Sequence, residues 1–192
     1  MRVSYIMKKG KSIWKPVTDR TSNKKHFGGN SKTGSTTWFT PKWLIDLLGP
    51  FNLDPCTDAK RPFNTANRHF TIKDNGLIMP WGTGRVWCNP PYDNIGPWLK
   101  RCEQHMNAIA LIFNRTETDF FNTHVWYGAY AVNFLPQRIK FIDAKGKVGK
   151  GGPGAGSVLI AYNAETAKLI QRVPGFYLPL HDIRKKLKIA KI

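Results

Sequence analysis

The sequence predicts an α/β fold with a reduced, mostly parallel sheet and an antiparallel C-terminal hairpin. A strand-forming run at 85–88 is followed by a helical pattern at 95–106 and an apolar strand at 109–113. Such a strand–helix–strand unit favours parallel strands with a right-handed crossover. Nearer the C-terminus, "RIKFI" and "SVLIAY" are two short strands around a long Gly-rich loop, which is typical of an antiparallel hairpin. The 192 residues suit one domain.

The ends of the chain predict basic segments outside this domain. Residues 1–35 carry nine basic residues against one acid, Asp19, and are rich in Ser, Asn and Gly, so we expect a flexible arm. The domain is expected over 36–180, and 181–192 as a basic C-terminal tail.

The first helix of the domain is predicted just after residue 40. Thr40 and Pro41 resemble an N-cap followed by proline at the first helical position, and Gly49 is the expected end. Helical spacing places four apolar side chains on the buried face: Trp43, Leu44, Leu47 and Leu48.

The next segments explain why the sheet is expected to be small. "FNLDPC" is a short strand broken by Pro55, and the stretch 57–84 shows little periodicity. It has room for one short strand near "HFTI" and a turn at "KDNG", but not for two full strand–helix units. A helix near 117–124 and a strand at "AYAVNFL" follow.

The charge of the chain indicates a polyanionic partner. The sequence has 30 Lys and Arg against 12 Asp and Glu, a formal net charge of +18, and such an excess speeds the capture of nucleic acid. No apolar run reaches the ~20 residues of a membrane span, and we expect a cytoplasmic protein without a signal peptide. The three cysteines predict neither disulfides nor a metal site.

The tetrapeptide Asn89-Pro90-Pro91-Tyr92 ends the strand at 85–88 and carries the predicted chemistry. The Asn89 side-chain oxygen and the Pro90 carbonyl are neutral acceptors on a stiff loop, and Tyr92 offers a flat face for a heterocycle. Two acceptors suit an amino group with two N–H donors in one plane.

Such a pair of acceptors activates an amine that is otherwise a poor nucleophile. The lone pair of adenine N6 is delocalised into the ring, and holding both N–H bonds biases the nitrogen towards a tetrahedral shape. The acceptors favour the transition state, because positive charge builds on the nitrogen as it attacks a sulfonium methyl. The alternative is that these four residues are only a rigid turn.

Several ordered segments resemble the bacteriophage-type DNA N-6-adenine-methyltransferase (Dam) family. They are "TTWFTPKWLIDLLGPFNLDPCTDAK", "FTIKDNGLIMPWGTGRVWCNPPYDNIGPWLKRC" and "LIFNRTETDFF" with "RIKF", and the similarity runs from about Thr36 to Tyr162. The resemblance implies a Rossmann-like fold, S-adenosylmethionine as cofactor, DNA adenine as substrate, and a phage or prophage origin.

The resemblance also implies roles for individual residues. Asn89, Pro90, Pro91 and Tyr92 match the family's catalytic loop. The segments near the cofactor are Phe39, Thr40 and Pro41, then Asp54, Pro55 and Cys56, and finally the turn at Asp74, Asn75 and Gly76. Arg115 and Arg138 would lie on the DNA side or in the target pocket.

Two departures from the family pattern are visible. The usual Gly-rich first motif is absent, since Thr57, Asp58 and Ala59 follow Cys56. The acid that would bind the cofactor's ribose stays open between Asp58 and Asp74.

A duplex adenine must be extruded from the stack before it can react. The arm, the C-terminal tail and the loop tip at Lys145, Lys147 and Lys150 are expected to contact phosphates without reading sequence. Because the chain has no insert large enough to be a target-recognition domain, we expect weak sequence specificity. We also favour a monomer. Open alternatives are an enzyme acting on RNA adenine or on a protein glutamine amide, and a non-catalytic nucleic-acid-binding relic of the fold.

Overall fold

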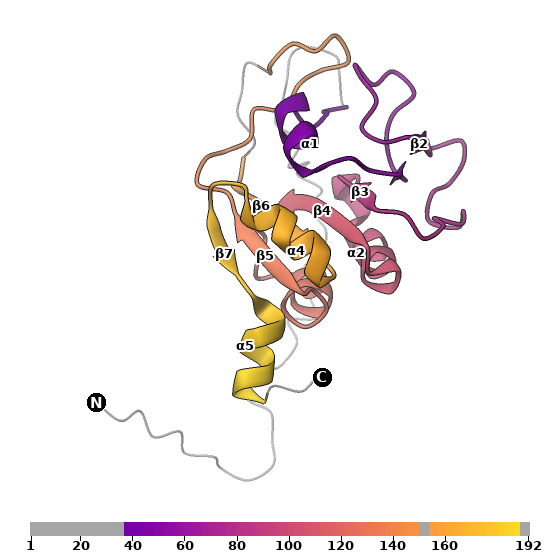
Figure 1. The fold of residues 1–192 in the computed structure, drawn as a ribbon. Helices are drawn as coiled ribbons and strands as arrows, with labels where there is room; N and C mark the ends of the chain where they lie inside the picture. Colours follow the sequence, from indigo (N-terminus) through magenta and orange to yellow (C-terminus); the bar gives the residue numbers. More distant parts are fainter. Residues whose placement is uncertain (1–36, 150–153, 189–192) are drawn as a thin grey trace, which may run out of the picture.

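The structure is a computed structural model that describes residues 37–149 and 154–188. The expected N-terminal arm, 1–35, and Lys150 lie outside these residues. Figure 1 shows the fold, in which one mixed sheet lies between helices.

Within the described residues the sheet has seven strands in the order β2-β1-β3-β4-β6-β5-β7. The strands β1 to β4 run parallel to one another, whereas β6 is inserted antiparallel between β4 and β5, and β7 pairs antiparallel with β5. The parallel half therefore agrees with the sequence-based expectation. The strands are β1 Leu53–Asp54, β2 Arg68–His69, β3 Val86–Cys88, β4 Ala108–Phe113, β5 Ala131–Phe134, β6 Ser157–Ala161 and β7 Phe176–Leu178.

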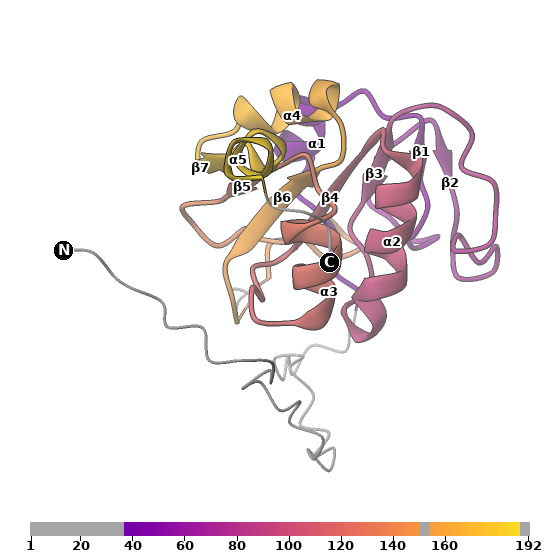
Figure 2. The same cartoon turned by 90° about the horizontal axis from the view of Figure 1, so that it is seen from below.

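Helices cover both faces of the sheet, as Figure 2 shows from below. Helices α1 (Lys42–Leu48) and α4 (Ala164–Gln171) lie on one face, and α2 (Ile95–His105) and α3 (Asp119–Phe121) lie on the other. A 3₁₀ turn, η1 (Tyr92–Asn94), precedes α2, a π-helical turn, η2 (Asn122–Trp126), follows α3, and α5 (Leu180–Leu187) closes the described chain.

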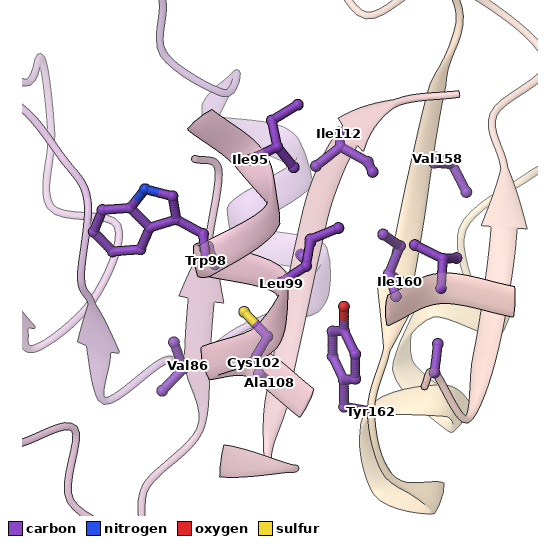
Figure 3. Close-up of a cluster of buried hydrophobic side chains, with 14 of the residues drawn as sticks. Val86, Ile95, Trp98, Leu99, Cys102, Ala108, Ile112, Val158, Ile160 and Tyr162 are labelled. Atoms are coloured by element: carbon purple, nitrogen blue, oxygen red, sulfur yellow. The ribbon is translucent and has the colours of Figure 1, made fainter. Parts of the chain in front are cut away.

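The two faces bury separate apolar clusters because side chains alternate along each strand. Val86 and Cys88 of β3 face the α2 side, whereas Trp87 between them faces α1 and α4. Figure 3 shows the α2 side, where Leu99 and Ile112 pack near Tyr162. Burying one such aliphatic side chain stabilises the fold by roughly 1.5–3 kcal/mol. The two clusters therefore stabilise the sheet from both faces.

The C-terminal hairpin predicted from "RIKFI" and "SVLIAY" is wrong in its pairing. Strand β6 pairs with β4 and β5, so the antiparallel hairpin is β5–β6, and the segment 138–142 contributes only a bridge from Ile142 to Phe39 and Val148. The reason is burial. All residues of β6 are buried, which requires neighbours on both sides, whereas Arg138 and Lys140 are exposed and suit the margin of the fold.

The first helix begins later and turns a different face inward than the sequence suggested. Pro41 is the N-cap residue, with extended backbone, so Thr40 does not cap the helix. Leu44, Ile45 and Leu48 are buried, whereas Trp43 is 55% and Leu47 40% exposed. Positions i, i+1 and i+4 fall within one apolar stripe, and the prediction omitted Ile45 from it.

Residues 181–187 of the expected C-terminal tail belong to helix α5. The His181 amide donates to the Tyr130 carbonyl, and Arg184 donates to the carbonyls of Trp126 and Ala129, each at 2.6 Å. These acceptors precede β5, so α5 lies at the amino end of that strand, at the bottom of Figure 1. Among the described residues, no helix is both long and apolar enough to cross a membrane.

Candidate active site

The carboxyl ends of β1, β3 and β4 lie side by side because these strands are parallel neighbours. Asp54 ends β1, Asn89 directly follows β3, and Phe113 ends β4. Open parallel sheets bind ligands at this edge. The structure thus places two of the sequence-predicted segments, the one at Asp54 and the one at Asn89, on neighbouring strands.

The loop after β3 presents an acceptor that no residue within 37–149 and 154–188 uses. Asn89 Oδ1 is buried and has no hydrogen-bond partner, while Pro90 is buried and Pro91 is the extended residue before η1. An unsatisfied buried acceptor costs about 1–3 kcal/mol, so its position points to a donor supplied from outside the chain. The prolines stop the strand at this point, as the sequence predicted.

Tyr92 opens η1, and its ring already has an aromatic neighbour. The ring is parallel to that of Phe113, with the centroids 4.1 Å apart and 16° between the planes. Phe113 in turn meets the ring of Phe141 edge-on at 6.4 Å. Sequence reasoning found Tyr92 but missed Phe113; the available signal was an aromatic residue at the end of the strand expected beside β3.

Asp54 is buried at the end of β1 and is held by internal hydrogen bonds. Its Oδ2 accepts a bond of 2.5 Å from the Thr65 hydroxyl, and its Oδ1 accepts one of 3.2 Å from the Cys56 amide. Burial raises the pKa of this carboxyl from 3.8 to about 6, against the opposing effect of the Thr65 bond. Thr65 lies in the segment without periodicity, where the sequence offered no signal for it.

Cys56 connects the end of β1 to the catalytic loop predicted from sequence. Its thiol lies 3.4 Å from the Asn89 carbonyl oxygen and 3.7 Å from the Cys88 sulfur. Burial raises the pKa of both thiols, so both sulfurs are protonated and act as neutral packing groups at neutral pH.

The turn at Asp74, Asn75 and Gly76 packs directly on the end of β1. A Cβ added at Gly76 would lie 1.9 Å from the Pro55 carbonyl oxygen, so only glycine fits there. The Asp74 carboxylate accepts bonds from the Thr71 amide and hydroxyl, and the amide bond in particular lowers its pKa. The two cofactor segments predicted around Asp54 and Asp74 are therefore in contact.

The segment before α1 lies beside the same aromatic group. Phe39 forms two backbone hydrogen bonds with Ile142, the residue after Phe141. The next residue, Thr40, is 2% exposed, and its hydroxyl has no hydrogen-bond partner among the described residues. Phe39 and Pro41 are buried on either side of it.

Most of the predicted DNA-side residues belong to segments that leave this edge. Arg115 follows β4, and the chain between Phe134 and Ser157, which carries Arg138, leaves and re-enters the sheet level with the end of β4. Lys145 and Lys147 are exposed on a turn whose amides donate to Asp143. In Figure 1 the described part of this chain up to residue 149 loops out at the top, opposite α5.

Two clefts found elsewhere in the described chain do not contain the predicted catalytic residues. One cleft, of about 590 Å³, is lined by residues of the segments 45–51 and 64–67. A second cleft, of about 530 Å³, is lined mainly by residues of α2 and η2. Neither includes Asn89 or Tyr92. No three His, Cys, Asp or Glu side chains within 37–149 and 154–188 gather into a group that could hold a metal ion.

Comparison with known proteins shows which family the chain belongs to. Residues 30–173 match the family of DNA N-6-adenine-methyltransferases (Dam). A DNA N-6-adenine-methyltransferase of Haemophilus phage HP1 (strain HP1c1) is 28% identical over 123 residues, which cover 58% of this chain and 69% of the phage protein. No solved structure matches the chain. Because the family match spans more than half of the sequence, this chain belongs to the DNA N-6-adenine-methyltransferase (Dam) family.

Proposed function

We propose that the protein transfers a methyl group from S-adenosylmethionine to N6 of an adenine in DNA. The observation that carries the proposal is the unpartnered Oδ1 of Asn89, a neutral acceptor at the end of β3 and close in the chain to the Tyr92 ring. Family membership supports the same reaction, since the family and its phage relative are named for DNA adenine methylation.

The residues around the end of β1 fit S-adenosylmethionine, within a fold of the Rossmann-like type. Gly76 lets the Asp74 turn lie against Pro55, and Thr40, in the segment before α1, offers a buried hydroxyl that has no partner among the described residues. Asp58 and Asp74 are the two acids available for the ribose hydroxyls. Asp54 fixes the shape of the β1 end, because both of its oxygens are held by internal donors. When bound, the cofactor supplies the reaction's electrophile, a methyl group on a positively charged sulfur.

The catalytic contribution of the chain is to hold the amine. Asn89 Oδ1 accepts one N–H of adenine N6, and the Pro90 carbonyl accepts the other. Both acceptors are neutral and fixed by the proline pair, so they stabilise the charge that develops on the nitrogen without first reorganising. Tyr92 orients the base by stacking, which contributes ~1–3 kcal/mol in nucleic-acid sites.

The target adenine must be flipped out of the duplex to reach Asn89. Arg115, Arg138, Lys145 and Lys147 lie on segments at the carboxyl edge of the sheet, where they would contact phosphates on either side of the flipped base. Such contacts position the duplex but do not read its sequence. We therefore propose low sequence specificity. We also propose that the protein is a monomer and that it acts in the cytoplasm on host or phage DNA.

Parallel assays with a labelled methyl donor test the proposed function. We expect transfer to duplex DNA, with N6-methyladenine as the product, and little transfer to RNA or to protein glutamine. Mapping the methylated adenines on a random duplex should show many short contexts. Transfer to RNA or protein alone would contradict the substrate, and one strict site of several bases would contradict the low specificity. Calorimetry that detects no S-adenosylmethionine binding, with or without DNA, would favour a non-catalytic relic.

A further inference from the structure

We propose that Phe113 fills the target-base position in the unbound protein and that the adenine replaces its ring against Tyr92. This inference rests on the proposed function and adds to it a residue that controls entry of the base. It starts from the parallel rings of Tyr92 and Phe113, with centroids 4.1 Å apart and planes 16° from parallel. This is the arrangement that a base stacked on Tyr92 would adopt.

The strand register puts Phe113 on the face of the sheet where the base must lie. Trp87 and Phe113 both belong to the apolar side that faces α1 and α4, whereas Cys88 and Ile112 belong to the other side. Continuing the alternation by one residue puts Asn89 on the side of Trp87. Because Cys88 pairs with Ala110, Asn89 is level with Leu111, and Phe113 is its diagonal neighbour on β4.

Two independent observations indicate that the site is closed. The Asn89 acceptor that should bind the amine is buried and has no partner in the part of the chain that the structure describes. The ring that should stack on the base is covered on one side by Phe113, although Tyr92 remains 40% exposed overall. A base cannot use both residues from this side until Phe113 withdraws.

The surroundings of Phe113 allow such a movement. Its side chain is only partly buried, and it is the last residue of β4, directly before the exposed Asn114. Its second aromatic neighbour is Phe141, whose ring lies at 84° to that of Phe113 with the centroids 6.4 Å apart. A departing Phe113 would leave this face of Tyr92 free for a base.

The proposal has a consequence for which bases enter. Every base that displaces Phe113 loses the Tyr92–Phe113 stack and regains a similar stack. Only a base with an amino group also satisfies Asn89 Oδ1, so the preference for such bases comes from Asn89, while the cost of moving the Phe113 ring is the same for every base.

The test compares Phe113→Leu and Phe113→Ala with Phe113→Tyr in the full chain. Leucine and alanine remove the flat ring, and tyrosine keeps it. Phe134→Leu is the matched control, because Phe134 is also a partly buried aromatic at the end of a strand but faces the α2 side. Circular dichroism and thermal unfolding identify any variant that does not fold, and the leucine variant preserves most of the apolar volume.

Two readouts distinguish the inference from the proposed function. The first is binding of free adenosine, followed by NMR of the tyrosine rings, and it needs no methyl transfer. We expect adenosine to bind about three- to tenfold more tightly to the leucine and alanine variants, the range expected for the loss of one ring–ring stack. The second is methyl transfer to DNA, where we expect KM to fall by a similar factor while kcat changes less than about twofold. The tyrosine variant and Phe134→Leu should behave like the unsubstituted protein.

Adenosine affinity that is unchanged or weaker in the leucine and alanine variants would overturn the inference. Weaker binding with a lower kcat would instead make Phe113 a support behind Tyr92, with the base on the opposite face. If the unsubstituted protein transfers no methyl group to DNA, the proposed function fails whatever the variants do.

Discussion

Asp54 Oδ2 accepts a 2.5 Å hydrogen bond from the Thr65 hydroxyl, which joins the end of β1 to the segment before β2. The carboxyl is 4% exposed, and burial raises its pKa from 3.8 to about 6. The charged form is therefore less favourable in the folded protein than in the unfolded chain. This relationship makes Asp54 a source of pH-dependent stability.

We expect Asp54 to destabilise the fold as the pH rises from about 4 to about 6. The unfolded chain ionises first, near 3.8, and the folded carboxyl follows only near 6. The shift corresponds to about 3 kcal/mol of unfolding free energy lost between these values, with no further change above them. Urea unfolding of the unsubstituted protein and Asp54→Asn across this range measures the difference. A difference that is constant with pH would contradict the buried, proton-binding carboxyl.

Gly76→Ala should destabilise the protein by about 3 kcal/mol, the upper part of the range for overpacking. The added Cβ would lie 1.9 Å from the Pro55 carbonyl oxygen, which is backbone and cannot move aside alone. S-adenosylmethionine affinity should fall as well, since the Asp74 turn and the β1 end separate. Gly154→Ala is the control, because nothing lies within 4 Å of its added Cβ. Equal stability of the two variants in urea unfolding would refute this packing.

Thr40→Val should weaken S-adenosylmethionine binding without weakening the fold. The Thr40 hydroxyl is buried and unpartnered, so removing it should leave the unfolding free energy unchanged or raise it by about 1 kcal/mol. Cofactor affinity, measured by calorimetry, should fall about tenfold if the hydroxyl bonds to the cofactor. Thr40→Ser keeps the hydroxyl and should bind normally. Normal binding by the valine variant would remove Thr40 from the cofactor site.

Replacing Lys145 and Lys147 by alanine should reduce the salt dependence of KM for DNA. Each lost phosphate contact lowers the slope of log K against log salt by about 0.9, so two contacts lower it by about 2. Lys185 and Lys186 provide a matched control: the sequence assigned them to a tail that was expected to contact phosphates, but they belong to α5, away from the proposed DNA edge. Helix α5 lies at the amino end of β5, whereas Lys145 and Lys147 belong to the chain that follows its carboxyl end. The two ends of the sheet are separated by about the length of β4, which is about 16 Å. An equal effect of both pairs would contradict the placement of DNA at the carboxyl edge.

Local signals were enough to predict that the first part of the sheet is parallel. The apolar runs at β3 and β4, with a helix between them, indicate that these two strands run in the same direction, and the prolines after Asn89 define where β3 ends. The order of the four parallel strands was not predicted. The order of the antiparallel half depends on which strand is buried on both sides, and β6 occupies the centre only through contacts with β4 and β5. Pairing between distant segments is not encoded in either strand alone.

The candidate site divides in the same way. Asn89 and Tyr92 could be predicted as site residues from their local chemistry, and the Asp54 and Asp74 segments from the resemblance to the family. The structure puts the Asp54 and Asn89 segments at the ends of neighbouring strands. Thr65 and Phe113 could not be predicted, because each matters only through a partner distant in sequence, Asp54 and Tyr92 respectively. Thr40 was predicted both as a cofactor residue and as the helix cap. The second prediction is wrong, because Pro41 is the N-cap residue, and the first stays a prediction.

Methyl transfer by Asn89→Ala is the most direct measurement of the central claim that a neutral acceptor activates the amine. Alanine removes the Oδ1 acceptor and leaves the proline pair and Tyr92 in place, so we expect transfer to DNA to fall below detection, while DNA affinity changes less than about twofold. Circular dichroism confirms the fold of the variant. An Asn89→Ala protein that methylates DNA at a rate near that of the unsubstituted enzyme would contradict the account.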